Sequence, residues 1–140
     1  WEILEKTGQF RFTPPTQSLL AYKQALDELK EEGGVIARGL RYKNNNEFLI
    51  SKMTELGFTE YLGEFKRGYI ISSFYYPSHP NFKFETFYTL LSDKGFIIYP
   101  GKLTNADCFR IGNIGHLFLK DMEELVHAIE DVLKEMDVKL

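Results

Sequence analysis

Apolar residues in the first quarter of the chain recur at helical spacing. Four of them share one face of a helix: Leu19, Tyr22, Leu26 and Leu29. Thr16 is expected as the N-cap of this helix, and Gly33-Gly34 as its C-terminal stop. The residues before it are expected to be extended, because Pro14-Pro15 disfavours helix in the preceding residues.

A second helix is predicted from about residue 35 to residue 56, closed by Gly57. Its apolar positions are Ile36, Leu40, Leu49, Met53 and Leu56. Its polar positions are Arg38, Arg41, Lys43 and Asn44 to Asn46, which we expect on the other face.

The pattern then changes to short strands. We expect strands over residues 58–62, 68–76, 95–99 and 108–112, and a short helix from Phe84 to Leu91 that ends before Gly95. Pro77 ends the second strand, and the Pro100-Gly101 turn closes the third.

The last helix carries the strongest helical pattern. Asp121 and Glu124 resemble a capping box, with Asp at the N-cap. One continuous apolar stripe follows: Met122, Leu125, Val126, Ile129, Val132, Leu133 and Met136. The whole order of elements predicts an α+β fold, a small, mainly antiparallel sheet covered by helices.

Composition excludes several classes of partner. The 140 residues carry a net charge of −3 without a basic patch, which argues against nucleic acid, and no apolar run is long enough to cross a membrane. The single cysteine, Cys108, fits a reducing compartment, so a cytoplasmic location is expected. We expect Cys108 to be a small buried hydrophobe.

The three histidines do not fall at metal-ligand spacing, so no metal site is expected. His127, one position beyond Val126 on the last helix, is interpreted as a histidine at the boundary of the apolar stripe and not as a ligand.

Two segments contain candidate binding residues. Alternation on the strand 108–112 places Arg110 opposite Phe109 and Ile111, with glycines after it that allow close approach of backbone to a ligand. Its guanidinium suits a carboxylate or phosphonate, although pattern alone favours a surface salt bridge. The Thr13 hydroxyl, ahead of Pro14-Pro15, is placed to donate to a phosphate, although pattern alone favours simple capping.

Both segments resemble known motifs. Phe12-Thr13-Pro14-Pro15-Thr16 resembles the motif that follows the cofactor lysine in the alanine–glyoxylate and serine–pyruvate branch of fold-type-I pyridoxal-phosphate (PLP) aminotransferases. Phe109-Arg110-Ile111-Gly112 resembles the substrate-arginine motif of that branch, at an agreeing distance. The wider run over 95–102 and 106–115 is similar to 2-aminoethylphosphonate–pyruvate transaminases, and the resemblance covers essentially the whole chain.

The resemblance implies a homodimer that uses PLP and moves an amino group from 2-aminoethylphosphonate to pyruvate, giving phosphonoacetaldehyde and alanine. Carried over by position, Thr13 would hydrogen-bond the PLP phosphate of the neighbouring subunit, and Arg110 would bind the anionic end of the substrate. PLP would supply the electron sink.

The family's Schiff-base lysine precedes the Thr13 motif by tens of residues, and Lys102 is not its counterpart. Since the chain opens at Trp1 within structured sequence, we expect a domain cut from a longer protein, inactive by itself. Residues 1–15 would be the end of the large domain or a connecting segment, and residues 16–140 the C-terminal small domain. The alternatives are an alanine–glyoxylate or serine–pyruvate type transaminase domain and a non-catalytic anion-binding or dimerisation module.

Overall fold

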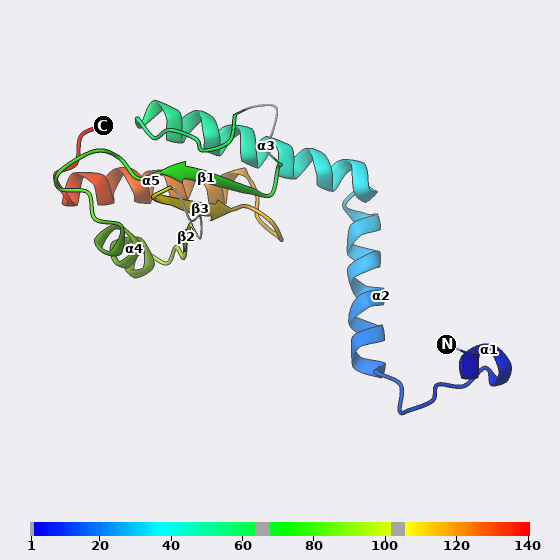
Figure 1. Ribbon diagram of the computed structural model, residues 1–140. Helices are drawn as coiled ribbons and strands as arrows, with labels where there is room; N and C mark the ends of the chain where they lie inside the picture. The colour runs from blue at the N-terminus through cyan, green and yellow to red at the C-terminus, as the bar shows by residue number, and fades with distance from the viewer. Residues whose placement is uncertain (1, 64–67, 102–105) are drawn as a thin grey trace. The chain divides into compact units, whose positions relative to one another are not determined.

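The computed structural model describes residues 2–63, 68–101 and 106–140 (Figure 1). Its elements are α1 (Glu2–Thr7), α2 (Thr16–Glu31), α3 (Gly34–Glu55), β1 (Ile71–Tyr75), α4 (Phe84–Asp93), β2 (Tyr99–Pro100), β3 (Cys108–Gly112) and α5 (Leu119–Glu135). They fall into two compact units, Trp1–Arg38 and Gly39–Leu140. Trp1 and Lys102, named above, lie outside the described residues.

The first unit consists of helices, and its described residues form no buried core. The predicted helix after Pro14-Pro15 is confirmed as α2, yet neither α1 nor α2 contains a buried residue. Large apolar side chains are exposed along this unit: Ile3, Phe10, Phe12, Leu19, Leu20, Tyr22, Leu26, Val35 and Ile36. The amphipathic pattern therefore predicts the helix correctly, but within the described residues of this unit its apolar face stays exposed.

Two predicted N-caps are wrong, by one residue at α2 and by three residues at α5. Pro15 is the N-cap of α2, and the Thr16 hydroxyl instead donates to the Pro14 carbonyl oxygen at 3.4 Å. At α5, Asp121 is the third helical residue, and its Oδ2 accepts the Phe118 backbone N–H at 2.7 Å. The carboxylate therefore satisfies a free N–H at the helix start from inside the first turn.

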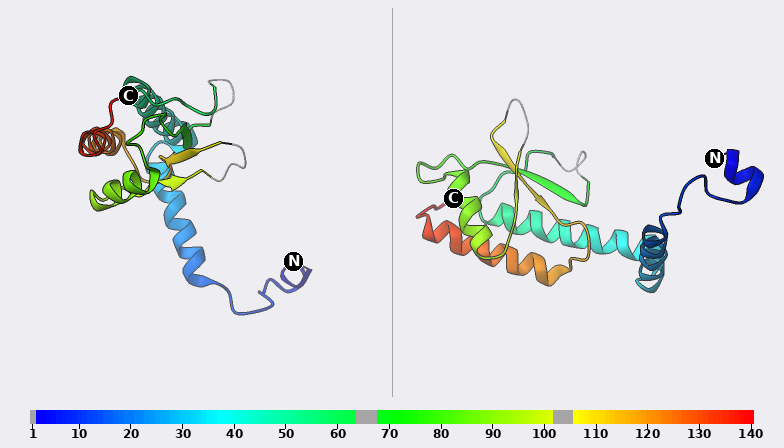
Figure 2. Two further views of the ribbon diagram at one scale, coloured as in Figure 1. Left: turned by 60° about the vertical axis from the view of Figure 1, so that its left-hand side comes forward. Right: turned by 90° about the horizontal axis from the view of Figure 1, so that it is seen from below.

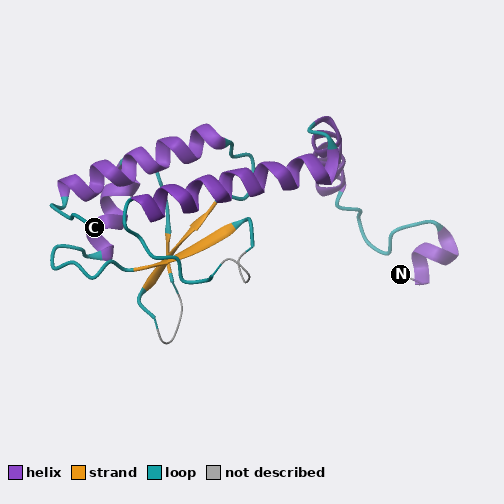
Figure 3. Ribbon diagram, turned by 90° about the horizontal axis from the view of Figure 1, so that it is seen from above, coloured by secondary structure: helices purple, strands orange, loops and turns teal. Residues whose placement is uncertain are grey.

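The second unit contains a three-stranded antiparallel sheet in the order β1-β3-β2. The central strand β3 matches its predicted range, and Ile71 to Tyr75 of β1 lie opposite Gly112 to Cys108. Helices α3 and α5 lie on one side of this sheet (Figure 3), and α4 packs against α5 (Figure 2). The predicted α+β class is confirmed.

Three predicted strands are shorter in the structure. Of the predicted segment 68–76, only Ile71–Tyr75 forms a strand, β1. The segment 58–62 contributes only one bridge, between Glu60 and Phe74. The segment 95–99 joins the sheet only at Tyr99, because Phe96 still donates its N–H to the Leu91 carbonyl at the end of α4, at 2.9 Å. Pro100 belongs to this edge strand and not to a turn.

The core lies between the sheet and its helices, and Phe109 of β3 is at its centre. Its side chain is 0% exposed. The ring lies within 5.6 to 6.3 Å of five others, centroid to centroid: Phe58, Phe74, Tyr76, Phe84 and Phe87. The predicted stripe of α5 is buried against the same core through residues such as Val126, Ile129 and Val132. This packing fixes the face of β3 that points inward.

The substitution Phe109→Ala is expected to lower the free energy of unfolding by about 3 to 5 kcal/mol, because it leaves a cavity among the rings. Urea unfolding measures it. Ile97→Ala, which truncates a side chain that is 57% exposed, serves as the control and is expected to change stability by less than about 0.5 kcal/mol. Equal losses in the two variants would contradict this account of the core.

Candidate functional site

Arg110 lies on the central strand and points away from the core. Phe109 and Ile111 are buried on the inner face, whereas Arg110 between them is only partly buried. The alternation predicted for this strand is therefore confirmed. Arg110 is consequently carried by the most firmly held strand, on the face opposite the helices.

The guanidinium of Arg110 is largely unengaged among the described residues. Its Nη2 donates to the Pro100 carbonyl oxygen at 3.3 Å, while its Nε is buried without a hydrogen-bond partner. No described carboxylate forms an ion pair with it, so the salt bridge that pattern alone favoured is not present in the described part of the chain. A guanidinium with free N–H groups and no counter-ion is suited to bind an anion.

Among the described residues, the face of the sheet that carries Arg110 is partly open: Cys108 on this face is buried, but three other neighbours are not. By strand alternation these are Ile71 and Tyr75 of β1 and Tyr99 of β2, and all three are exposed. Apolar and aromatic side chains around one cation give a surface on which a small acid could bind with partial exclusion of water.

Cys108, two residues before Arg110, is a buried thiol. Its side chain is 1% exposed, and burial raises its pKa although the Arg110 charge acts to lower it. Since the thiolate is the reactive form, this cysteine is disfavoured as a nucleophile. Gly101 packs directly on it: a Cβ at Gly101 would lie 2.6 Å from the Cys108 carbonyl oxygen, so only glycine fits there. The prediction that Cys108 is a small buried residue is confirmed.

The loop after β3 is held by polar groups that the sequence did not indicate. Asn113 is 0% exposed. Its Nδ2 donates to the Tyr69 carbonyl at 2.8 Å and to the Tyr42 carbonyl at 3.3 Å, and its backbone N–H donates to the Ile70 carbonyl at 3.0 Å. One side chain thereby ties the end of β3 to α3 and to the approach of β1.

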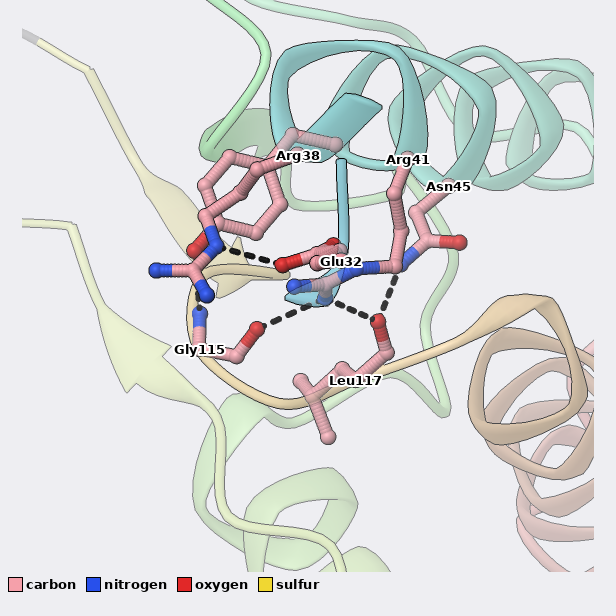
Figure 4. Close-up of polar contacts among 7 residues, drawn as sticks. Glu32, Arg38, Arg41, Asn45, Gly115 and Leu117 are labelled. Carbon is pink, nitrogen blue, oxygen red and sulfur yellow. Dashed lines mark hydrogen bonds and ion pairs between the residues drawn. The ribbon is translucent and has the colours of Figure 1, made fainter. Parts of the chain in front are cut away.

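Helix α3 holds the same loop at two further carbonyls (Figure 4). Arg41 Nη1 donates to the carbonyl oxygens of Gly115 at 2.8 Å and Leu117 at 2.7 Å, and Asn45 Nδ2 donates to that of Leu117 at 2.9 Å. The glycines of this loop were expected to let backbone approach a ligand. Instead, the Gly115 carbonyl is engaged by α3. Figure 4 also shows Arg38 Nε bound to Glu32 Oε2 at 2.6 Å, within the first unit.

The assignment of Asn45 and Asn46 to a polar outer face of α3 is wrong. Both side chains are buried, and Asn46 Nδ2 donates to the Ser72 hydroxyl at 2.8 Å. An amide can occupy the core when its hydrogen bonds are made there, so polarity alone misplaced these two residues. Three consecutive asparagines at positions 44–46, which interrupt the apolar pattern of a helix, were the available signal.

The substitution Asn113→Ala is expected to cost about 1 to 3 kcal/mol of stability, because two carbonyl oxygens in a partly buried setting lose their donor. Thermal unfolding of the chain measures it. Asn44→Ala, at an exposed position of α3, removes an amide of the same size and is expected to change the stability little. A loss no larger than that control would show that the Asn113 contacts do not hold the loop.

Thr13 lies in the first unit, and Arg110 in the second. Thr13 is exposed, and no hydrogen bond of its hydroxyl occurs among the described residues. It lines a hollow of about 690 Å³ together with Ile3, Phe10, Phe12 and Pro15. A free hydroxyl at the rim of a hollow has the chemistry of a hydrogen-bond donor to a ligand.

The described residues contain no group of three or more His, Cys, Asp or Glu placed to hold a metal ion. His127 is exposed on α5 beside the buried stripe. In the described part of the chain, no helix combines the length and the apolar character needed to cross a membrane.

Sequence comparison relates the chain to one kind of enzyme. It is 48% identical over 134 residues to a 2-aminoethylphosphonate–pyruvate transaminase of Vibrio vulnificus, covering 95% of this chain and 36% of that protein. A 2-aminoethylphosphonate–pyruvate transaminase of Rhizobium meliloti is 49% identical over 138 residues, covering 99% of this chain and 36% of that protein. The chain thus spans just over a third of these relatives' length. No family model matches it.

Solved structures show the same fold at low identity. A ureidoglycine–glyoxylate aminotransferase of Bacillus subtilis aligns with a TM-score of 0.83 at 19% identity, over 98% of this chain and 36% of that one. An alanine–glyoxylate aminotransferase of Nostoc aligns with a TM-score of 0.77 at 20% identity, over 89% of this chain and 33% of that one. The resemblance derived from the motifs is confirmed: the chain is homologous to a C-terminal portion of 2-aminoethylphosphonate–pyruvate transaminases and has the α+β fold of an aminotransferase domain.

Proposed function

We propose that this chain is the C-terminal domain of a PLP-dependent transaminase that moves the amino group of 2-aminoethylphosphonate to pyruvate. In this domain Arg110 binds the anionic end of the substrate. The observation that carries the proposal is the state of Arg110, which lies on an open face of the central strand, without a carboxylate partner among the described residues.

A single cationic group could bind either of the two substrates. 2-Aminoethylphosphonate and pyruvate both end in an anion, and a guanidinium can bind either through two parallel N–H···O hydrogen bonds. Because β3 is held by a strand on each side, the guanidinium starts from a backbone that moves little. A fixed cation holds the anionic end of each substrate in place and so restricts the orientation of the rest of the molecule.

PLP requires more than this chain provides. When bound, it supplies an electron sink for the transfer of the amino group. The Thr13 hydroxyl, exposed and without a described partner, fits a donor to the cofactor phosphate, and we propose that role for it toward the neighbouring subunit of a homodimer. The Schiff-base lysine of the family has no assigned counterpart here, so we assign the rest of the cofactor site to the large domain.

The exposed apolar side chains of the first unit support this proposal of a larger assembly. Side chains such as Phe12, Tyr22 and Ile36 are each more than half exposed. Apolar surface of that kind usually marks a contact with another domain or subunit. We therefore propose that residues 1–15 connect to the large domain and that residues 16–140 form the small domain. We also propose that the complete enzyme is cytoplasmic, because the single cysteine of this chain fits a reducing compartment. The coding sequence upstream of Trp1 tests the domain assignment directly, because a native start there would refute it.

The chain alone is not expected to bind PLP stably or to form a covalent bond to it, because we assign no lysine of this chain to the Schiff base and most of the cofactor site to the large domain. Mixing it with PLP, reducing with borohydride and measuring the intact mass checks this. The complete transaminase serves as the positive control. A stoichiometric adduct at a single lysine of the isolated chain would contradict the proposal.

In the complete transaminase, Arg110→Ala is expected to lower kcat/KM for 2-aminoethylphosphonate by about 30-fold to 1000-fold, because a charge-assisted pair is lost. Arg110→Lys should retain part of the activity, since it keeps the charge without the planar fork. Lys120→Ala, which removes an exposed cation of α5, is the control. Activity of Arg110→Ala within about threefold of wild type would refute the assigned role.

The same assay separates the related activities. If the complete enzyme failed to turn over 2-aminoethylphosphonate but used alanine with glyoxylate, the domain would belong to the alanine–glyoxylate type. If anions bound to the isolated chain in an Arg110-dependent way and no large domain were encoded, it would be a non-catalytic binding module.

A further inference from the structure

The register of the sheet places one hydroxyl-bearing residue on each side of Arg110. Ser73 of β1 and Tyr99 of β2 are the residues directly opposite it. Directly opposed residues of antiparallel strands share a face, with Cβ atoms about 4.5 to 5.5 Å apart. Ser73, Arg110 and Tyr99 therefore form one row across the open face of the sheet.

Neither hydroxyl is used by the fold. No side-chain hydrogen bond of Ser73 or Tyr99 occurs among the described residues, and Tyr99 is 57% exposed. Ser72 shows the contrast: it faces the core, is 3% exposed, and accepts the Asn46 amide hydrogen at 2.8 Å. Of these two adjacent serines, Ser72 is therefore bonded within the core, and Ser73 lies on the open side of the sheet.

The guanidinium lies toward the β2 side of this row. Its Nη2 is bound to the Pro100 carbonyl oxygen at 3.3 Å, and Pro100 is the residue next to Tyr99. An anion bound by the remaining N–H groups would therefore lie on the same face of the sheet as both hydroxyls, nearer to β2 than to β1. Both hydroxyls rotate and can donate a hydrogen bond.

The two anions of the proposed reaction differ in how many donors they can use. A carboxylate has two oxygens, which the planar fork of an arginine satisfies. A phosphonate, like a phosphate group, has three acceptor oxygens and a larger negative charge. The third oxygen needs donors beyond those of the guanidinium, and a site lacking them leaves it poorly bound.

We propose that Ser73 and Tyr99 are specificity-determining residues, which donate hydrogen bonds to the phosphonate oxygens that Arg110 leaves unsatisfied. This rests on the proposed function, in that Arg110 is taken to bind the anionic end of the substrate. The row selects a tetrahedral phosphonate as amino donor, while a carboxylate substrate is bound by Arg110 alone.

The test uses the complete transaminase, with kcat/KM measured for 2-aminoethylphosphonate and, in the reverse direction, for alanine. Ser73→Ala and Tyr99→Phe are each expected to lower the value for 2-aminoethylphosphonate about tenfold, as for the loss of a hydrogen bond to a charged group. Less than about a twofold change is expected for alanine. Ser73→Thr, which keeps the hydroxyl, should retain the wild-type ratio.

The control is Tyr22→Phe, which removes the phenol hydroxyl of a side chain that is 64% exposed on α2, outside the sheet. It should leave the ratio of the two substrates unchanged. Equal losses for both substrates in Ser73→Ala and Tyr99→Phe, or no loss for either, would overturn the inference. If Arg110→Ala is also without effect, the proposed function itself fails, whereas a large effect of Arg110→Ala leaves that function standing.

Discussion

The packing of Phe109 against five other rings is the interaction on which the second unit depends. It fixes the inward face of β3, so it also fixes that Arg110 points outward. In a strand, neighbouring side chains lie on opposite faces, so the inward position of Phe109 places Arg110 on the other face of the sheet. A register slip by one residue would bury the arginine and expose the phenylalanine, which makes the register costly to change.

The same constraint brings polar side chains together on the outer face of the sheet. Arg110 is the partly buried cation of the central strand, and the residues across from it come from strands that are distant in sequence, Ser73 and Tyr99. Each strand alone contributes an ordinary polar position. The antiparallel pairing is what gathers a guanidinium and two hydroxyls into one row, suited to a small acid with several oxygens.

The loop that follows β3 shows how the helix layer supports this face from behind. Asn113, buried and bonded to α3 and to the approach of β1, anchors the end of the strand two residues after the guanidinium's neighbour Ile111. The first unit contrasts with this arrangement, because its helices leave apolar side chains such as Phe12 and Ile36 exposed. Within the described residues, the interior is therefore complete around the sheet and incomplete along the N-terminal helices.

The sequence by itself determined helices α2 to α5, though not α1, together with the central strand and the side on which Arg110 lies, because these depend on the period of local apolar residues. It also carried the family motifs around Thr13 and Arg110. Only the tertiary structure decided that Asn46 and Asn113 are buried, that the segment 95–99 pairs only at its end, and that Ser73 and Tyr99 flank the arginine. Those features depend on contacts between residues far apart in the chain, and periodicity along the chain carries no information about such partners.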